Sequence, residues 1–500
     1  MEGNFERKSL DCLTVPLRQI QNSEQTLEIK LPEGMPDVGQ VLTAWGQPVM
    51  RSKEWQDSTV QFAGGMMIWV LYVPEDGSQE QCIHGWIPFQ LRWELPEDTP
   101  EGSVHFRCLP RFVDGRSTSP RKILVRAGLA VLAEAFSPEK LALAVPGEMP
   151  EDVALLENTY PLRLLKEAGE KSFLLEETLR LPDSVPEIGQ LIYWRLNPRV
   201  ADQRVLGDKA VLRGNGNLHV LYRSTGGQIH GWDFEVPFSQ FVELRGEYGS
   251  DARMELALMP TVLELELELG EGGDLQLKGG IAAQYVITDK QPITLVEDAY
   301  SPNRELSFQQ EDISPQVLLE NRRETIYGEQ TLPVQADIIA EAQLLPDFPR
   351  QRPFEGGVNL EYPGQLQILY YGENGRLQAT SARWNGEQTF QAADAAQMTA
   401  IPLGADIQAT AGNGRIQMKM ELPVELSTSA IQCIGMVTGL EIGQQKKQDP
   451  NRPSLILQRA GDLCLWDLAK LTGSTVDAIR RVNGLEHEPA PDQMLLIPIA

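Results

Sequence analysis

The chain has 500 residues, of which 42% are hydrophobic and 23% are charged, and its formal net charge is −26. A chain of this length exceeds one ordinary hydrophobic core and predicts several domains, and its composition is that of a globular rather than a disordered protein. The large negative charge disfavours nucleic acid and anionic membranes as partners, because both are polyanions.

The sequence also indicates a compartment. The sequence contains no run of about 18 apolar residues, so it predicts no membrane span. Its N-terminus lacks the basic start and apolar core of a secretion signal. The five cysteines, Cys12, Cys82, Cys108, Cys433 and Cys464, are scattered and form no C-x-x-C pair. This pattern argues against a disulfide framework or a zinc module and is typical of a reducing compartment. We therefore expect a cytoplasmic protein.

An internal duplication occupies most of the chain. Residues 31–42 and 181–192 share the pattern L-P-x-x-x-P-acid-aliphatic-G-Q-aliphatic-aliphatic, at an offset of 150 residues. Val-Leu-Tyr at residues 70–72 returns at 220–222 with the same offset. Such ordered self-similarity is the signature of repeated domains. We predict that the two copies superpose, each a β repeat, the first over residues 1–138 and the second over residues 159–310, with a linker over 139–158.

The tetrapeptide Ile-His-Gly-Trp occurs in both copies, at residues 83–86 and 229–232. Its histidines, His84 and His230, are candidates for a metal or catalytic site. Two sites in separate domains form a poor shared cage, because metal ligands must converge. We interpret the tetrapeptide as a marker of the repeat, at equivalent positions in the two copies, and expect no metal there.

A third, decayed copy follows over residues 311–445. It keeps Ile-Leu-Tyr at residues 368–370 but has Arg-Trp-Asn at 383–385 in place of the tetrapeptide. All three copies have the character of β-strands. Residues 262–269 alternate leucine with glutamate, which predicts a strand with one buried and one solvated face, and Gly- and Asn-rich turns separate such runs. The predicted fold class is mainly β, with three sandwich or barrel-like domains.

The pattern changes after a polar linker at residues 446–453. Residues 454–458 predict a short strand, and apolar residues at helical spacing predict a helix around Trp466. Ser474 is the expected cap of a second helix, which Gly484 ends, and residues 494–497 predict a last strand. Residues 454–500 therefore predict a small βααβ domain.

This domain resembles the LysM family, through Leu-Trp-Asp-Leu-Ala-Lys at residues 465–470, Val-Asn-Gly-Leu at 482–485 and Gln-Met-Leu-Leu-Ile-Pro at 493–498. LysM domains generally bind glycans that contain N-acetylglucosamine, in a groove between two loops. The resemblance implies that the groove residues here are Gly461, Asp462, Leu463 and Cys464 on one side and Asn483, Gly484, Leu485 and Glu486 on the other.

Two features depart from the LysM pattern. The first loop is one residue longer and places Cys464 where the family has a capping serine or threonine, and Asp492 replaces a glycine in the last turn. A reshaped first loop changes one wall of the sugar groove. We therefore hypothesise that this surface binds a protein at least as well as a glycan.

The repeats together with the C-terminal domain resemble the SPOCS-domain proteins of spore-forming Firmicutes. The resemblance is strongest over residues 24–136, 170–308 and 454–500. It implies a non-enzymatic scaffold of spore-envelope assembly, located in the mother-cell cytoplasm at the forespore surface. In that family the LysM domain contacts the morphogenetic ATPase that coats the forespore, so the implied partner is that ATPase or another coat protein, with an N-acetylglucosamine glycan as a further ligand.

Two other functions remain open. A peptidoglycan-binding cell-wall protein would be expected to carry an export signal, and a hydrolase with a LysM anchor would need an acid pair or a nucleophile within a repeat. The sequence has no P-loop, G-x-S-x-G, H-E-x-x-H or Rossmann fingerprint. We expect no enzyme activity and no cofactor.

Overall fold

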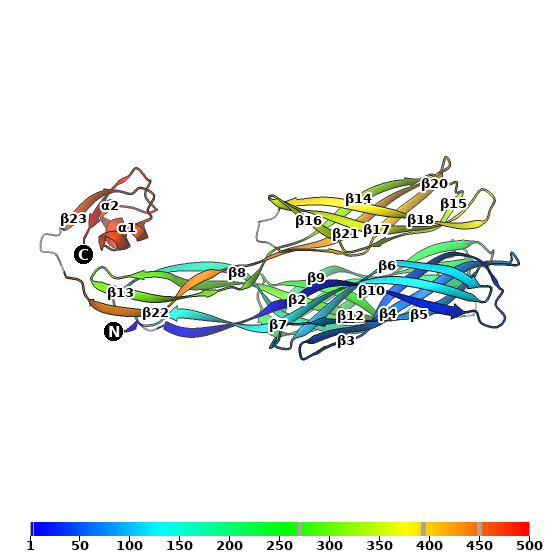
Figure 1. Cartoon of the computed structure of the whole chain (residues 1–500), viewed down its shortest axis with the longest axis horizontal. Helices are drawn as coiled ribbons and strands as arrows, with labels where there is room; N and C mark the ends of the chain where they lie inside the picture. The colour runs from blue at the N-terminus through cyan, green and yellow to red at the C-terminus, as the bar shows by residue number, and fades with distance from the viewer. Residues whose placement is uncertain (1, 4, 269–272, 392–396, 448–452, 500) are drawn as a thin grey trace.

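The protein is mainly β, as predicted, and elongated. The structure is a computed structural model that describes residues 2–499 apart from residue 4 and segments 269–272, 392–396 and 448–452. Figure 1 shows a broad body of strands at one end, a narrower stem, and a small C-terminal module beside the tip of the stem. Within the described residues, helix occurs only in this module, as α1 (Leu465–Thr472) and α2 (Val476–Asn483).

The first part of the chain forms two three-stranded antiparallel sheets, in the orders β2-β7-β6 and β3-β4-β5. Their strands are β2 (Phe5–Lys30), β3 (Val38–Gln56), β4 (Thr59–Pro74), β5 (Gln81–Glu94), β6 (Ser103–Ser119) and β7 (Lys122–Pro146). In β5, residues 87–94 alternate strictly between buried and exposed, because successive side chains point to opposite faces of a sheet. One core cluster joins residues of both sheets, among them Phe62, Phe89 and Phe106.

The second part pairs in the orders β8-β12-β11 and β9-β10. Its strands are β8 (Ala154–Leu179), β9 (Ile188–Ser224), β10 (Ile229–Tyr248), β11 (Arg253–Leu267) and β12 (Leu275–Tyr300). In β11 the alternation predicted from the sequence is present, since Leu263 and Leu265 are buried and Glu264 and Glu266 are exposed.

The third part pairs β21 with β14, β19 and β20, and β17 with β15, β16 and β18. Its strands are β13 (Arg304–Ile313), β14 (Gln316–Leu332), β15 (Ile338–Pro346), β16 (Arg350–Phe354), β17 (Gly357–Tyr371), β18 (Leu377–Gln391), β19 (Gln397–Pro402), β20 (Asp406–Gly412), β21 (Arg415–Ile431) and β22 (Ile434–Gln445). The short β1 (Glu2–Gly3) pairs with β22, so the start of the chain lies beside the end of the third part.

The stem is made by strands from all three parts. Strands β2, β8 and β12 each have 26 residues, which corresponds to about 85 Å at roughly 3.3 Å per residue. They run out of the body and pack with β7, β13, β14 and β22 around one apolar cluster, which contains Leu141, Leu164, Leu295, Ile313 and Met436. The stem is therefore a shared product of segments that are up to 424 residues apart in the sequence (Cys12 to Met436).

A second shared cluster lies in the body. It contains the middle leucine of each Val-Leu-Tyr or Ile-Leu-Tyr segment, Leu71, Leu221 and Leu369, which are at most 2% exposed. Trp45 and Tyr193 stack beside them, with ring centroids 5.1 Å apart and an interplanar angle of 10°. This cluster fixes the three parts relative to one another, because its buried side chains interdigitate.

The predicted segment boundaries differ from the strands in two places. Most of the segment 139–158, expected to be a linker, belongs to β7 and β8, which leave only residues 147–153 between them. The boundary expected at residue 311 falls inside β13. Both segments are polar and contain proline, but they form strands of the stem. Most of their charged side chains are exposed. The last predicted linker, 446–453, begins where β22 ends, and residues 448–452 lie outside the described part.

The two Ile-His-Gly-Trp segments are not at equivalent positions. In the first part Ile83 pairs with Val70, whereas in the second part Val220, the counterpart of Val70, pairs with Trp232. The shift arises because three residues, 233–235, separate the tetrapeptide from Val-Pro-Phe at 236–238 in the second copy, whereas in the first copy Ile-Pro-Phe at 87–89 follows the tetrapeptide directly. The tetrapeptide thus does not mark a structural position, and the prediction that it does was wrong.

Candidate functional site

The C-terminal module places two helices between two paired strands. Strand β23 (Leu455–Arg459) pairs antiparallel with β24 (Met494–Pro498), and this order of elements agrees with the order expected from the sequence. The fully buried apolar side chains of the module's core come from α1, α2 and β24. They are Leu465, Leu468, Ala469, Ile479, Leu495 and Ile497. The second helix is capped by Thr475, whose hydroxyl accepts a hydrogen bond from Ala478 N at 3.2 Å, and not by Ser474 as predicted.

The first helix has an unusual N-terminus. Cys464 occupies the N-cap position in extended backbone conformation, but its side chain makes no capping hydrogen bond and instead donates to Asp467 Oδ2 at 3.1 Å. The backbone N–H of Leu465 donates to Glu488 Oε2 at 2.8 Å. A carboxylate at this end of a helix is favoured by the helix dipole. Glu488 thereby connects the loop after α2 to the loop before α1.

Of the eight predicted groove residues, Asn483 is the last residue of α2, and the other seven lie on these two loops. Gly461, Asp462, Leu463 and Cys464 are all exposed, and so are Gly484 and Glu486. Leu485 is half-buried and packs against the core of the module. The hydrogen bond of Glu488 joins the two loops that carry most of the predicted groove residues.

The side chain of Asn483 is hydrogen-bonded within the module rather than free. Its Nδ2 donates to the carbonyl oxygens of Ile479 at 2.8 Å and Leu496 at 2.6 Å, and its Oδ1 accepts from Leu496 N at 2.8 Å. These bonds join the end of α2 to β24 and occupy the polar atoms of the amide. Asn483 stays a predicted groove residue, and its side-chain amide is engaged within the module.

The module is attached to the tip of the stem through α1. Trp466 Nε1 donates to Asp298 Oδ2 at 2.8 Å, and Lys470 Nζ lies 2.7 Å from both carboxylate oxygens of Asp298. The indole of Trp466 meets the ring of Tyr300 edge to face, with centroids 4.7 Å apart. Burial opposes the charge of Asp298, but the hydrogen bonds from Lys470 and Trp466 outweigh it and hold the pKa of this carboxyl below its ordinary value.

Trp466 has two roles. Its half-buried ring packs against the core of the module and also joins the module to β12. Asp298 and Tyr300 lie more than 160 residues before Trp466, and no local pattern marks them as its partners. Because the contact uses α1, both loops of the candidate groove stay exposed.

Neither of the two singled-out histidines joins a site. His84 is exposed on β5 opposite Trp69, and His230 is half-buried on β10 against the ring of Tyr222, at 5.8 Å between centroids. A third histidine, His219, is buried between two carboxylates. Its Nδ1 is 2.8 Å from Asp233 Oδ1 and its Nε2 is 2.9 Å from Glu341 Oε2.

His219 belongs to a network of polar groups between the second and third parts. Arg195 Nη1 donates to Gln343 Oε1 at 2.9 Å, and Gln343 Nε2 donates to Gln367 Oε1 at 2.9 Å. Burial opposes the charge of His219, but Glu341 and Asp233 outweigh it and raise its pKa to about 9. Both ring nitrogens are engaged, so the geometry is that of an ion-pair connection rather than of a catalytic base.

Comparison with known proteins relates one segment to a family. Residues 187–269 match the model of the SipL, SPOCS domain, a range that runs from the start of β9 to the end of β11. No curated protein and no solved structure matches the chain. No helix in the described part is long and apolar enough to cross a membrane. The second part of the chain is therefore similar to the SipL SPOCS domain over residues 187–269, which supports a SipL-like protein.

Proposed function

We propose that this protein is a non-enzymatic scaffold of spore-envelope assembly. The observation that carries the proposal is the match of residues 187–269 to the SipL SPOCS domain. By the same resemblance, the site of action is the mother-cell cytoplasm at the forespore surface. An elongated molecule with a β body at one end and a small module at the other suits the joining of two partners (Figure 1).

The proposed scaffold contains three SPOCS-like β repeats. Two equivalent hydrogen bonds support the first two, because Tyr72 donates to the carbonyl of Pro36 at 3.0 Å and Tyr222 donates to that of Pro186 at 2.9 Å. The third repeat is supported by its order of strand pairing, in which β14-β21 and β15-β17-β18 follow the pattern of β2-β7 and β3-β4-β5. The shared leucine cluster then makes the three repeats one rigid body.

The C-terminal module is proposed to be a LysM domain that docks a coat morphogenetic protein. The loop before α1 is exposed, and Leu463, 40% exposed, presents an apolar side chain there. Exposed apolar groups beside backbone loops are typical of protein-binding surfaces. The second candidate ligand is an N-acetylglucosamine glycan, which the LysM resemblance favours and which would use the same two loops.

The test uses the full-length chain and two changes in the groove, Leu463→Asp and Glu486→Arg. We expect each to reduce binding to the coat ATPase at least tenfold, because a central contact of a protein interface contributes about 1.4 kcal/mol or more. The matched control is Leu457→Asp, which puts the same charge on an exposed leucine of β23, away from the groove. Equal binding by all variants would contradict the assignment of the groove.

Chito-oligosaccharide is titrated against the same proteins. Micromolar binding of the sugar to the unchanged chain, lost in the groove variants, with no affinity for the ATPase, would replace the scaffold proposal with the glycan-binding alternative. Binding of the ATPase without sugar supports the scaffold.

A further inference from the structure

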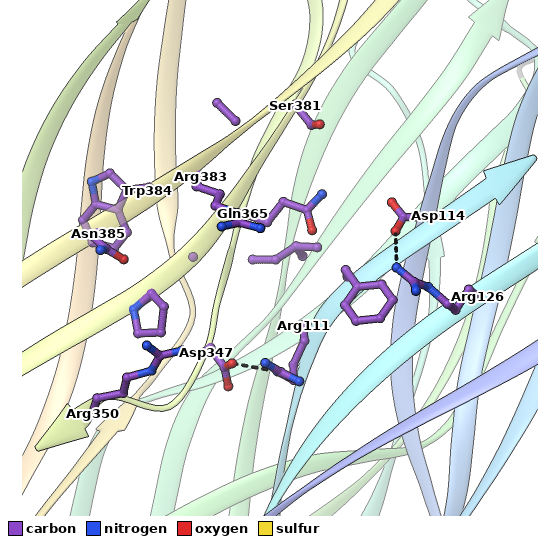
Figure 2. A pocket seen from close by; sticks show the side chains of 15 residues that line it. Arg111, Asp114, Arg126, Asp347, Arg350, Gln365, Ser381, Arg383, Trp384 and Asn385 are labelled. Atoms are coloured by element: carbon purple, nitrogen blue, oxygen red, sulfur yellow. Dashed lines mark hydrogen bonds and ion pairs between the residues drawn. The ribbon is translucent and has the colours of Figure 1, made fainter.

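A cleft of about 870 Å³ lies between the first and third parts of the chain, far in sequence from the C-terminal module. Its walls come from β6 and β7 on one side and from β15 to β18 on the other (Figure 2). A hydrogen-bonded ion pair joins the walls, since Arg111 Nε of β6 donates to Asp347 Oδ2 at 2.7 Å. The backbone N–H of Phe348 donates a hydrogen bond of 2.8 Å to the other oxygen of this carboxylate, Oδ1. Both oxygens of Asp347 are therefore hydrogen-bonded.

The charge in the cleft is opposite in sign to that of the protein. Four arginines line it, Arg111, Arg126, Arg350 and Arg383, against only two carboxylates, Asp114 and Asp347. The local formal charge is therefore +2 (four minus two), whereas the whole chain has −26. The chain as a whole has 70 acidic and 44 basic residues, so acidic residues outnumber basic ones. In the cleft the basic residues are in excess.

Two of the arginines are already engaged. Arg111 pairs with Asp347, and Arg126 lies 3.6 Å from Asp114 with its guanidinium 4.9 Å from the centre of the Phe112 ring. The other two, Arg350 and Arg383, are exposed, and no carboxylate of the described residues is within ion-pair distance of either. Their guanidinium groups are thus available to a ligand.

The arrangement of the charges defines the kind of anion. Figure 2 shows the four arginines at separate positions around the cleft rather than converging on one point. They come from β6, β7, β16 and β18, and the polar residues Gln365, Ser381 and Asn385 also line the cleft. A single phosphate needs converging donors, whereas several carboxylates along an extended chain match dispersed ones. The volume lies within the usual range for sites that enclose a ligand of several residues or rings.

We propose that this cleft binds an acidic peptide segment of a partner protein, with Arg350 and Arg383 as the groups that contact its carboxylates. Arginine suits this role because its planar guanidinium forms two parallel hydrogen bonds with a carboxylate. The apolar side chains of Phe112, Leu345 and Pro363 line the cleft between the charges and contact the aliphatic parts of the peptide. This site is separate from the C-terminal module and stands whether or not the module docks a coat protein.

The test measures fluorescence polarisation of a short labelled peptide of alternating glutamate and alanine against the full-length chain. We expect the peptide to bind at low salt and more weakly at high salt, because ions screen exposed charges. The double variant Arg350→Gln/Arg383→Gln is expected to weaken binding by about tenfold, since each exposed ion pair contributes up to about 1 kcal/mol. The control variant Arg415→Gln removes one exposed arginine of β21 outside the cleft and should bind as the unchanged chain does.

Several results would overturn the proposal. Equal binding of the glutamate peptide by the double variant would place its site elsewhere, provided that circular dichroism shows both proteins folded. Equal binding of a glutamine–alanine peptide would show that charge is not recognised. Binding of inorganic phosphate without the peptide, lost in the double variant, would show a phosphate site, and self-association of the chain that the double variant abolishes would identify the occupant as a second copy.

Discussion

The indole N–H of Trp466 donates a hydrogen bond of 2.8 Å to Asp298, a carboxylate 168 residues earlier at the tip of the stem. Lys470 binds the same carboxylate and Tyr300 contacts the indole ring. One acidic side chain, Asp298, thus joins the tip of the stem to two side chains of α1.

We predict that Asp298→Ala releases the module without unfolding the body. The change removes a charge-assisted hydrogen bond and an ion pair, which together contribute about 2 kcal/mol to docking. Limited proteolysis should then cut the segment 446–453 faster, while the thermal transition of the body stays the same. Glu264→Ala, which removes an exposed carboxylate of β11, is the control. Unchanged cleavage of the Asp298 variant would show that other contacts hold the module.

The His219 network predicts a loss of stability at alkaline pH. The pKa of His219 is raised to about 9 by Glu341 and Asp233, against the effect of burial, and its ordinary value is 6.5. A raised pKa means that the folded state binds the proton more tightly than the unfolded state does. Its stabilisation is therefore complete below pH 6.5 and is lost as the pH rises through 9.

Urea unfolding at several pH values between these limits measures this effect. As the pH rises from 6.5 to 9, deprotonation of His219 should lower the free energy of unfolding of the unchanged chain by about 2–3 kcal/mol. In His219→Gln that loss should be largely absent, because the replacement does not titrate. His84→Gln, at an exposed position, should keep the pH dependence of the unchanged chain. Parallel curves for the His219 variant and the unchanged chain would show that His219 is neutral in the folded protein.

The tyrosine hydrogen bonds test the equivalence of the first two repeats. Tyr72→Phe and Tyr222→Phe each remove one hydroxyl that donates to a proline carbonyl. We expect similar losses of about 1 kcal/mol in the free energy of unfolding, since each leaves a part-buried carbonyl without its donor. Tyr327→Phe, at a ring that is 73% exposed, should have no measurable effect. A large difference between the first two variants would count against equivalent roles.

The cap of α1 predicts a stabilising substitution. Cys464 has the extended backbone of an N-cap, φ −74° and ψ 167°, but makes no side-chain cap. Cys464→Ser supplies a hydroxyl that accepts from the first turn, and we expect about 0.5–1 kcal/mol more stability in the module. Slower amide hydrogen exchange within residues 465–472 is the measurement. Cys433→Ser, at another exposed cysteine, is the control, and faster exchange in the Cys464 variant would refute the prediction.

The sequence by itself determined the features that depend on local periodicity. The alternation of leucine and glutamate predicted the strand with buried Leu263 and Leu265, and apolar spacing with Gly484 predicted the second helix of the module and its end. Strands and helices have fixed side-chain periods, and glycine tolerates the left-handed conformation that ends a helix. Both properties depend only on residues that are close together in the sequence, so the sequence is enough to predict them. The recurrence of Val-Leu-Tyr likewise identified Leu71 and Leu221, whose burial at a shared centre the structure then showed.

Tertiary structure alone decided which segments meet. The tetrapeptide Ile-His-Gly-Trp is identical in both copies, yet three added residues shift it along its partner strand, because register is set by the buried face and not by sequence identity. His219 and Asp233 face each other across the paired strands β9 and β10, but Glu341 reaches His219 only through packing of the second and third parts. Asp298 and Trp466 meet only where the module packs on the stem, and Arg111 and Asp347 only where the first and third parts pack. The last three of these contacts join side chains whose partners are chosen by how separate parts of the chain pack. No local pattern encodes that choice, since its energy comes from surfaces buried between distant parts of the chain.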